Sequence, residues 1–159
     1  MYGGINLICQ GLCIGPMLSV NSQQLQKNNI THVLSILNDF QPKGNLKNEY
    51  KFLIIDLLDD ETQNISKHFE ETYNFIDDCI SNGGTVLVHC FAGISRSSTI
   101  CIAYLMKKLR LPFEEALAMV REVRQFVEPN GGFVKQLKHF ETQLGITPPK
   151  SVVVSHGYI

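Results

Sequence analysis

Three short apolar runs mark the first half of the chain. They cover residues 31–37, 51–56 and 85–88 and read THVLSIL, KFLIID and TVLV. Each run is rich in β-branched residues and is bounded by residues that favour turns. The runs therefore predict three buried strands.

Helical periodicity follows between the second and third runs. Through residues 64–80, apolar side chains recur at intervals of three or four positions. They are Ile65, Phe69, Tyr73, Ile76 and Ile80. The Asn-Gly-Gly sequence at 82–84 is typical of a helix end. The pattern predicts a helix over 64–80.

Three more helices are predicted in the second half of the chain. Residues 97–109 are apolar nearly all round, which indicates a central helix. The next predicted helix covers 112–124 and has Pro112 in its first turn. The last has one apolar face, formed by Phe133, Leu137, Phe140 and Leu144.

Strands that alternate with helices predict an α/β fold. We expect a single domain over residues 1–145, with a central, largely parallel sheet flanked by helices on both faces. Two prolines follow Gly145 and stop the last helix. We expect residues 146–159 to form a flexible tail, with a short edge strand over 151–154 as the alternative.

Composition narrows the partners and the compartment. The chain has 159 residues, 44% of them hydrophobic and 18% charged, and its net charge is −1. This charge gives no general attraction to nucleic acid or to an anionic membrane. The N-terminus lacks a charged signal region, and no apolar run reaches the length of a membrane span. We expect neither nucleic acid as a partner nor a membrane anchor.

Five cysteines are scattered through the chain, and no two have the C-x-x-C spacing of a zinc or redox site. Reduced thiols in the cytoplasm or the nucleus fit this pattern. The histidines show no shared spacing typical of metal ligands. We expect no metal site.

The segment HCFAGISRS, residues 89–97, lies between the third strand and the central helix. In parallel sheets, ligands bind beyond the carboxyl ends of the strands. A short loop that opens a helix there gathers its N–H groups around one concavity, at the positive end of the helix dipole. The residues that would bind a phosphate in this way are Phe91, Ala92, Gly93, Ile94, Ser95 and Arg96.

Two side chains add chemistry to this predicted cradle. Arg96 supplies a planar fork that can bind two phosphate oxygens at once. Cys90 lies at the bottom of the cradle, where the same field favours its thiolate form. A thiolate that faces a bound phosphorus atom is a nucleophile. Gly93 permits a backbone conformation that other residues resist.

The segment matches the HCxxGxxRS signature of cysteine-dependent protein phosphatases. Five more blocks resemble the dual-specificity branch of that family in the same order: GLCIGP, ITHVLSI, DDETQNI, AYLMKK and EPNGGFVKQL. Together they span about residues 5–144. No docking module precedes them, so the resemblance is to the small, atypical members that lack a kinase-docking domain.

This resemblance implies a role for each residue of the motif. Cys90 would form a cysteinyl-phosphate, and Arg96 would hold the phosphate oxygens through the transition state. Ser97 would hydrogen-bond the sulfur and stabilise the departing thiolate. His89 would orient the loop without transferring protons. The scheme needs no metal or cofactor.

A carboxylic acid on a separate loop is expected to protonate the leaving oxygen. The candidates are Asp56, Asp59 and Asp60, and the family's D-x-x-x-Q-N-L pattern selects Asp59, with Asp60 as the second choice. The same carboxylate would then take a proton from the hydrolytic water. Asn130 would either cap the last helix or support the catalytic loop.

Three functions remain open. The first is a protein phosphatase that acts on phosphotyrosine, with phosphoserine and phosphothreonine as further substrates. The second is the same chemistry on a phosphoinositide or an RNA 5′ end, which the uncharged loop and Ser97 disfavour by comparison with such relatives. The third is a module that binds phosphorylated partners without turnover. The retained catalytic residues favour the first.

Overall fold

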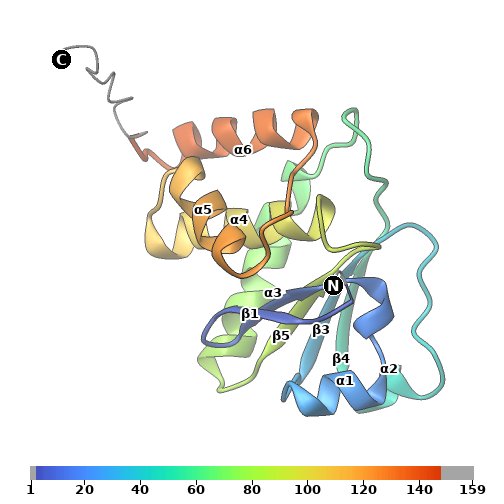
Figure 1. Ribbon diagram of the computed structural model, residues 1–159. Coiled ribbons are helices and arrows are strands. Elements are labelled where there is room, and N and C mark those ends of the chain that lie inside the picture. The colour runs from blue at the N-terminus through green and yellow to red at the C-terminus, as the bar shows by residue number, and fades with distance from the viewer. Residues whose placement is uncertain (1–2, 148–159) are drawn as a thin grey trace.

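The computed structural model describes residues 3–147 and contains one five-stranded sheet (Figure 1). Its strands are β1 (Asn6–Cys9), β2 (Leu12–Gly15), β3 (His32–Ile36), β4 (Lys51–Ile55) and β5 (Val86–His89). Their order in the sheet is β1-β2-β5-β3-β4. The neighbouring strands β2, β5, β3 and β4 pair in parallel, and β1 pairs with β2 as an antiparallel edge strand. The predicted largely parallel α/β sheet is confirmed.

The three predicted strands are β3, β4 and β5, whereas β1 and β2 were not predicted. Gly11 lies between them with φ +85°, a conformation that suits the tight turn of a hairpin. Both strands have four residues, and β2 is buried by pairing with β5 far along the chain. This long-range pairing is invisible to local periodicity.

Helices cover both faces of the sheet, as predicted. They are α1 (Ser22–Lys27), α2 (Leu46–Glu49), α3 (Phe69–Ser81), α4 (Arg96–Leu109), α5 (Phe113–Val123) and α6 (Gly131–Gln143), with short 3₁₀ turns η1 (Met17–Ser19) and η2 (Ser66–His68). Figure 1 shows α4, α5 and α6 gathered on one side of the sheet, with α1 and α2 on the other.

The helix predicted over 64–80 begins later than expected, at Phe69. Asn64 accepts hydrogen bonds from Ser66 Oγ and Lys67 N, and Ser66 N donates to Gln136 Oε1 of α6. These bonds hold the backbone before α3 in a turn and then in η2. The apolar stripe beginning at Ile65 therefore runs through two kinds of helix rather than one.

Alternate residues of the strands feed two hydrophobic cores. Val86 and Val88 of β5 pack into the larger core, which α3 to α6 complete. Leu87 faces the opposite way and packs with Leu25 of α1 and Leu46 of α2. Since each core buries one face, the sheet is held between two layers of helices.

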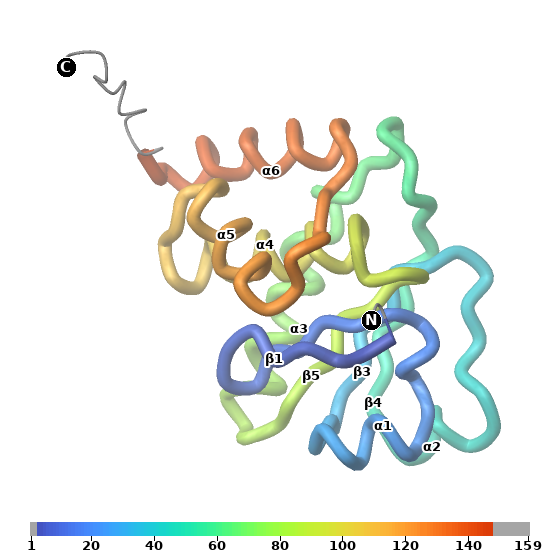
Figure 2. Tube along the Cα trace, in the orientation of Figure 1, coloured from blue at the N-terminus to red at the C-terminus, as the bar shows by residue number. Residues whose placement is uncertain are grey.

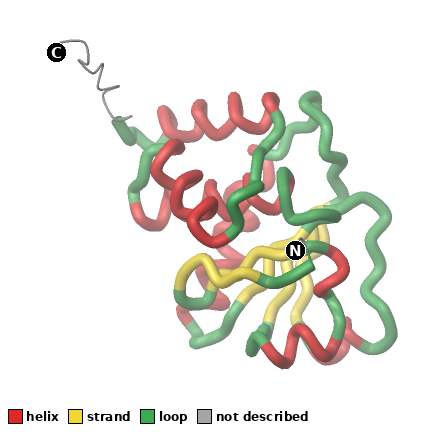
Figure 3. Tube along the Cα trace, in the orientation of Figure 1, coloured by secondary structure: helices red, strands yellow, loops and turns green. Residues whose placement is uncertain are grey.

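The parallel strands β3, β4 and β5 end at the same edge of the sheet. The segments that leave these carboxyl ends start side by side in Figure 2, and Figure 3 shows all three beginning as loops. They place residues 37–45, 56–65 and 90–95 near one another. This edge is where a parallel sheet binds ligands.

Most of the predicted tail, residues 148–159, lies outside the described residues, as does the alternative edge strand over 151–154. Across residues 3–147, no helix is long and apolar enough to cross a membrane.

Candidate active site

The loop between β5 and α4 has all of its carbonyl groups hydrogen-bonded to the protein. The carbonyls of residues 91–95 accept, in chain order, from Met17 N, Arg124 Nη2, Arg124 Nε, Glu128 N and Thr99 N, at 2.9–3.0 Å. A trans peptide places its C=O and N–H groups on opposite sides. The N–H groups of residues 92–96 therefore point away from these partners, toward the concave side of the loop.

Arg124 binds this loop on the side of its carbonyl groups, and no local sequence pattern predicts this role. Its side chain is buried, with 2% exposure. In addition to the carbonyls of Ala92 and Gly93, it donates to Gly4 O and Asn6 Oδ1. One planar guanidinium thereby ties the loop to the start of the chain.

Gly93 has the conformation expected of glycine, with φ +72°. A Cβ at this position would lie 2.7 Å from Arg124 Nη2 and 2.9 Å from Gly15 O. Both the backbone angle and the close neighbours therefore require glycine here.

Cys90 lies at the base of the loop, where the sequence placed it. Its side chain is buried, with 3% exposure, and its Sγ lies 3.2 Å from Ser97 Oγ in the first turn of α4. The predicted contact between Ser97 and the sulfur is present. Since a hydroxyl can donate to sulfur, this geometry suits a charged thiolate.

Arg96 is also buried, and its guanidinium nitrogens differ in their hydrogen bonding. Nη1 donates to Leu57 O at 2.9 Å and to Asn38 Oδ1 at 3.4 Å. Nε has no hydrogen-bond partner among the described residues. A buried donor without a partner is costly, and a bound anion would satisfy it.

His89, the last residue of β5, links the start of the loop to β3. Its Nδ1 donates to Cys90 O at 3.1 Å, so Nε2 accepts from Ser35 Oγ at 2.6 Å. Burial lowers the pKa of His89 to about 4, and the nearby Arg96 charge acts in the same direction. His89 is therefore neutral near pH 7, and it contacts the loop rather than the concave side, as expected of an orienting residue.

The three candidate acids occupy different surroundings. Asp59 Oδ1 accepts a 2.9 Å hydrogen bond from Asn130 Nδ2. Asp60 instead accepts from Thr62 N and Thr62 Oγ1, and these bonds lower its pKa. For Asp56 no comparable link to the loop is present in the described part of the chain. Asp59 is thus connected to the site through Asn130, whereas Asp60 stabilises a local turn with Thr62.

Asn130 combines the two roles that the sequence left open. Its Oδ1 caps α6 by accepting from Phe133 N, while its own backbone N–H donates to Ser95 Oγ in the loop between β5 and α4. Together with its bond to Asp59, these contacts make Asn130 a bridge between the loop and the candidate acid.

Helix α6 positions the segment that carries Asp59. Gln136 Nε2 donates to Gln63 O at 2.9 Å. Gly132 approaches Glu61 so closely that a Cβ would overlap the Glu61 carbonyl oxygen. The sequence assigned no role to Gln136 or Gly132, although both belong to the quoted EPNGGFVKQL block.

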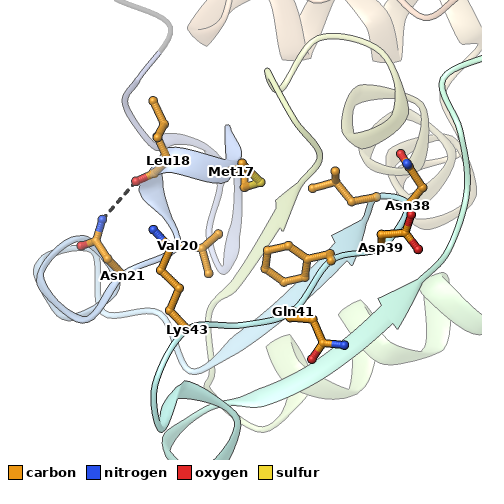
Figure 4. Close-up of a pocket in the computed structure, with 10 residues that line it drawn as sticks. Met17, Leu18, Val20, Asn21, Asn38, Asp39, Gln41 and Lys43 are labelled. Carbon is orange, nitrogen blue, oxygen red and sulfur yellow. Dashed lines mark hydrogen bonds between the residues drawn. The ribbon is translucent and has the colours of Figure 1, made fainter.

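A pocket of about 330 Å³ lies beside this site, between η1 and residues 37–43 (Figure 4). Asn38, which contacts Arg96, is part of its lining together with Asp39, Gln41 and Lys43. Within residues 3–147, no cluster of three or more His, Cys, Asp or Glu side chains could hold a metal ion.

The family model for the dual specificity phosphatase catalytic domain matches residues 12–143. A probable dual specificity protein phosphatase of Dictyostelium discoideum is 49% identical over 86% of this chain and 34% of its own length. Dual specificity protein phosphatase 22 of Homo sapiens is 41% identical over 89% of this chain and 76% of its own length.

Two solved structures have the same fold. The structure of DUSP15 is 35% identical, covers 94% of this chain and 99% of its own, and has a TM-score of 0.81. The human tyrosine phosphatase-like serine/threonine/tyrosine-interacting protein is 37% identical, covers 88% of this chain and 97% of its own, and has a TM-score of 0.83. This chain spans about a third of the Dictyostelium relative.

Proposed function

Since this chain belongs to the dual specificity phosphatase family, as its motifs predicted, we propose that it hydrolyses phosphate monoesters on proteins through a cysteinyl-phosphate at Cys90. The observation that carries the proposal is the loop itself. Its carbonyls are bonded to the surrounding protein, so its N–H groups point to the opposite side, and the buried Nε of Arg96 has no partner among the described residues. These donors suit a phosphate dianion.

In the first step, the Cys90 thiolate attacks phosphorus, and an S–P bond forms as the P–O ester bond breaks. The departing oxygen takes a proton from Asp59. The fork formed by Nε and Nη2 of Arg96 binds two equatorial oxygens while charge shifts in the transition state. The bond from Nη1 to Leu57 O holds this fork in position.

In the second step, the Asp59 carboxylate takes a proton from water, and the resulting hydroxide oxygen bonds to phosphorus. The S–P bond breaks, and its electron pair returns to Cys90. Ser97 Oγ, 3.2 Å from the sulfur, donates a hydrogen bond to the departing thiolate. Atoms and charge balance without a metal or cofactor.

We propose phosphotyrosine as the main substrate, with phosphoserine and phosphothreonine also accepted. Residues 91–95 carry no charged side chain that would meet the extra phosphates of a phosphoinositide. Phosphorylated proteins are therefore the proposed partners.

The five cysteines are all free, which supports the proposed cytoplasmic or nuclear location.

A module that binds phosphorylated partners without turnover is the second candidate. It is kept because one relative in the comparison is described as tyrosine phosphatase-like and as an interacting protein. The contact between Cys90 and Ser97 and the link between Asn130 and Asp59 favour catalysis here.

The test is hydrolysis of p-nitrophenyl phosphate in reducing, metal-free buffer across a range of pH. We expect a bell-shaped profile with a mildly acidic optimum, because the reaction needs Cys90 ionised and Asp59 protonated. Cys90→Ser should abolish turnover, whereas Cys9→Ser, the matched control outside the loop, should retain it. An inert parent that still binds phosphopeptides would support the binding module instead.

A further inference from the structure

An apolar groove lies against the catalytic loop, and the mechanism above makes no use of it. Pro16, Met17 and Leu18 line one wall, and Phe91, Ala92 and Ile94 line the other. Its volume is about 380 Å³. In the part of the chain that the structure describes, no charged side chain contributes to its lining.

The two walls expose unusually large apolar side chains. Leu18 is 78% exposed and Phe91 is 62% exposed, more than any other large hydrophobic side chain of the described residues. Single exposed apolar residues are ordinary, but two that face one groove beside a reaction centre indicate a binding surface.

The groove is already formed in the structure. Met17 N donates to Phe91 O at 2.9 Å, so a backbone bond joins the two walls. Asn21 Nδ2 donates to Leu18 O at 3.0 Å and holds the turn that presents Leu18. Met17 and Leu18 also line the neighbouring pocket drawn in Figure 4, so the groove adjoins that pocket.

The loop that forms one wall is also the proposed phosphate site. Phe91 directly follows Cys90, so a peptide whose phosphate lies over Cys90 brings its neighbouring residues to the groove. We propose that the groove binds an apolar side chain of the phosphoprotein, close to the phosphotyrosine in sequence, and that this contact selects substrates. The proposal rests on the phosphatase activity proposed above.

The test uses a set of phosphotyrosyl peptides in an alanine-serine background. One leucine is moved through the three positions on either side of the phosphotyrosine. We expect one or two positions to raise kcat/KM about tenfold, mainly through KM, because a leucine partly leaves water. Binding of the same peptides to Cys90→Ser, measured by calorimetry, should show the same preference without any turnover.

Leu18→Ser should remove the leucine preference and leave hydrolysis of p-nitrophenyl phosphate unchanged. Leu109→Ser is the matched control, since Leu109 is 47% exposed at the far end of α4. Equal kcat/KM for all peptides, or a preference that survives in Leu18→Ser, would overturn the groove proposal while the phosphatase function stands. If no substrate is hydrolysed, the proposed function fails, and peptide binding still decides on the groove.

Other occupants predict other results. A dimer in sedimentation that Leu18→Ser abolishes would place a second copy of the chain in the groove and overturn the proposal. Co-sedimentation with phosphatidylcholine vesicles that depends on Leu18, found together with equal kcat/KM for all peptides, would also overturn the proposal.

Discussion

Asn130 donates a 2.9 Å hydrogen bond from Nδ2 to Oδ1 of Asp59, across a separation of 71 residues. The same residue caps α6 and donates from its backbone to Ser95 of the catalytic loop. The candidate acid is therefore positioned by the helix that also contacts the proposed phosphate-binding loop.

Replacing Asn130 separates capping from positioning. Asn130→Asp keeps the cap of α6 but removes the Nδ2 donor that holds Asp59 in place, so we expect a kcat about tenfold lower. The loss should be larger for phenyl phosphate, whose leaving group needs a proton, than for p-nitrophenyl phosphate. Asn130→Ala should instead lower the free energy of unfolding, measured with urea, by about 1 kcal/mol, because the cap of α6 is lost. Equal kcat for parent and Asn130→Asp would remove Asn130 from the positioning of Asp59.

The two neighbouring carboxylates should behave differently. Asp59→Asn should lower kcat on phenyl phosphate about a hundredfold and flatten one limb of the pH profile, because the proton donor is lost. Asp60→Asn should change kcat less than about twofold, since Asp60 is bound to Thr62. Steady-state kinetics of both variants against pH would decide, and a reversed order of effects would identify Asp60 as the acid.

Arg124 offers a test of loop geometry at constant charge. Arg124→Lys cannot replace the separate bonds to Ala92 O and Gly93 O. We expect the free energy of unfolding to fall by about 2 kcal/mol or more, and inhibition by inorganic phosphate to weaken about tenfold. Arg121→Lys is the matched control, because Arg121 donates to Val127 O away from the loop. Unchanged phosphate inhibition in Arg124→Lys would show that the loop keeps its shape without these bonds.

His89 makes stability depend on pH in a defined window. In the unfolded chain its pKa is near 6.5, whereas burial holds the folded pKa at about 4. Between these values the unfolded chain binds more protons, so stability falls as the pH decreases from about 6.5 to about 4. Because of His89, the free energy of unfolding should be about 2 kcal/mol lower at pH 5 than at pH 7.

Urea unfolding at the two pH values measures this effect. His89→Gln should lose that part of the pH dependence, while His139→Gln, exposed on α6, should retain it. An identical pH dependence in His89→Gln and the parent would mean that another group carries the effect.

The residues of the proposed catalytic loop could be placed from local sequence because they are contiguous. Six positions separate Cys90 from Arg96, and one strand and one helix place both side chains. Sequence reasoning missed Arg124, Ser35 and Gln136, which reach the site through packing between distant elements. No periodicity or motif spacing reports such contacts.

The same distinction explains the errors in the fold. Strands β1 and β2 are defined by pairing with each other and with β5, so their short runs were overlooked. The start of α3 was placed too early because the bond from Ser66 N to Gln136 Oε1 is a tertiary contact. Apolar spacing alone does not distinguish η2 from the first turn of an α-helix.

The most direct test of the central claim is detection of phosphate on Cys90. The parent and the Asp59→Asn variant would be mixed with excess p-nitrophenyl phosphate, quenched in acid and mapped by mass spectrometry. We expect phosphate on the peptide that contains Cys90, at higher occupancy in Asp59→Asn, whose second step is slowed, and none in Cys90→Ser. Turnover that persists in Cys90→Ser, without phosphate on that peptide in the parent, would contradict the covalent mechanism.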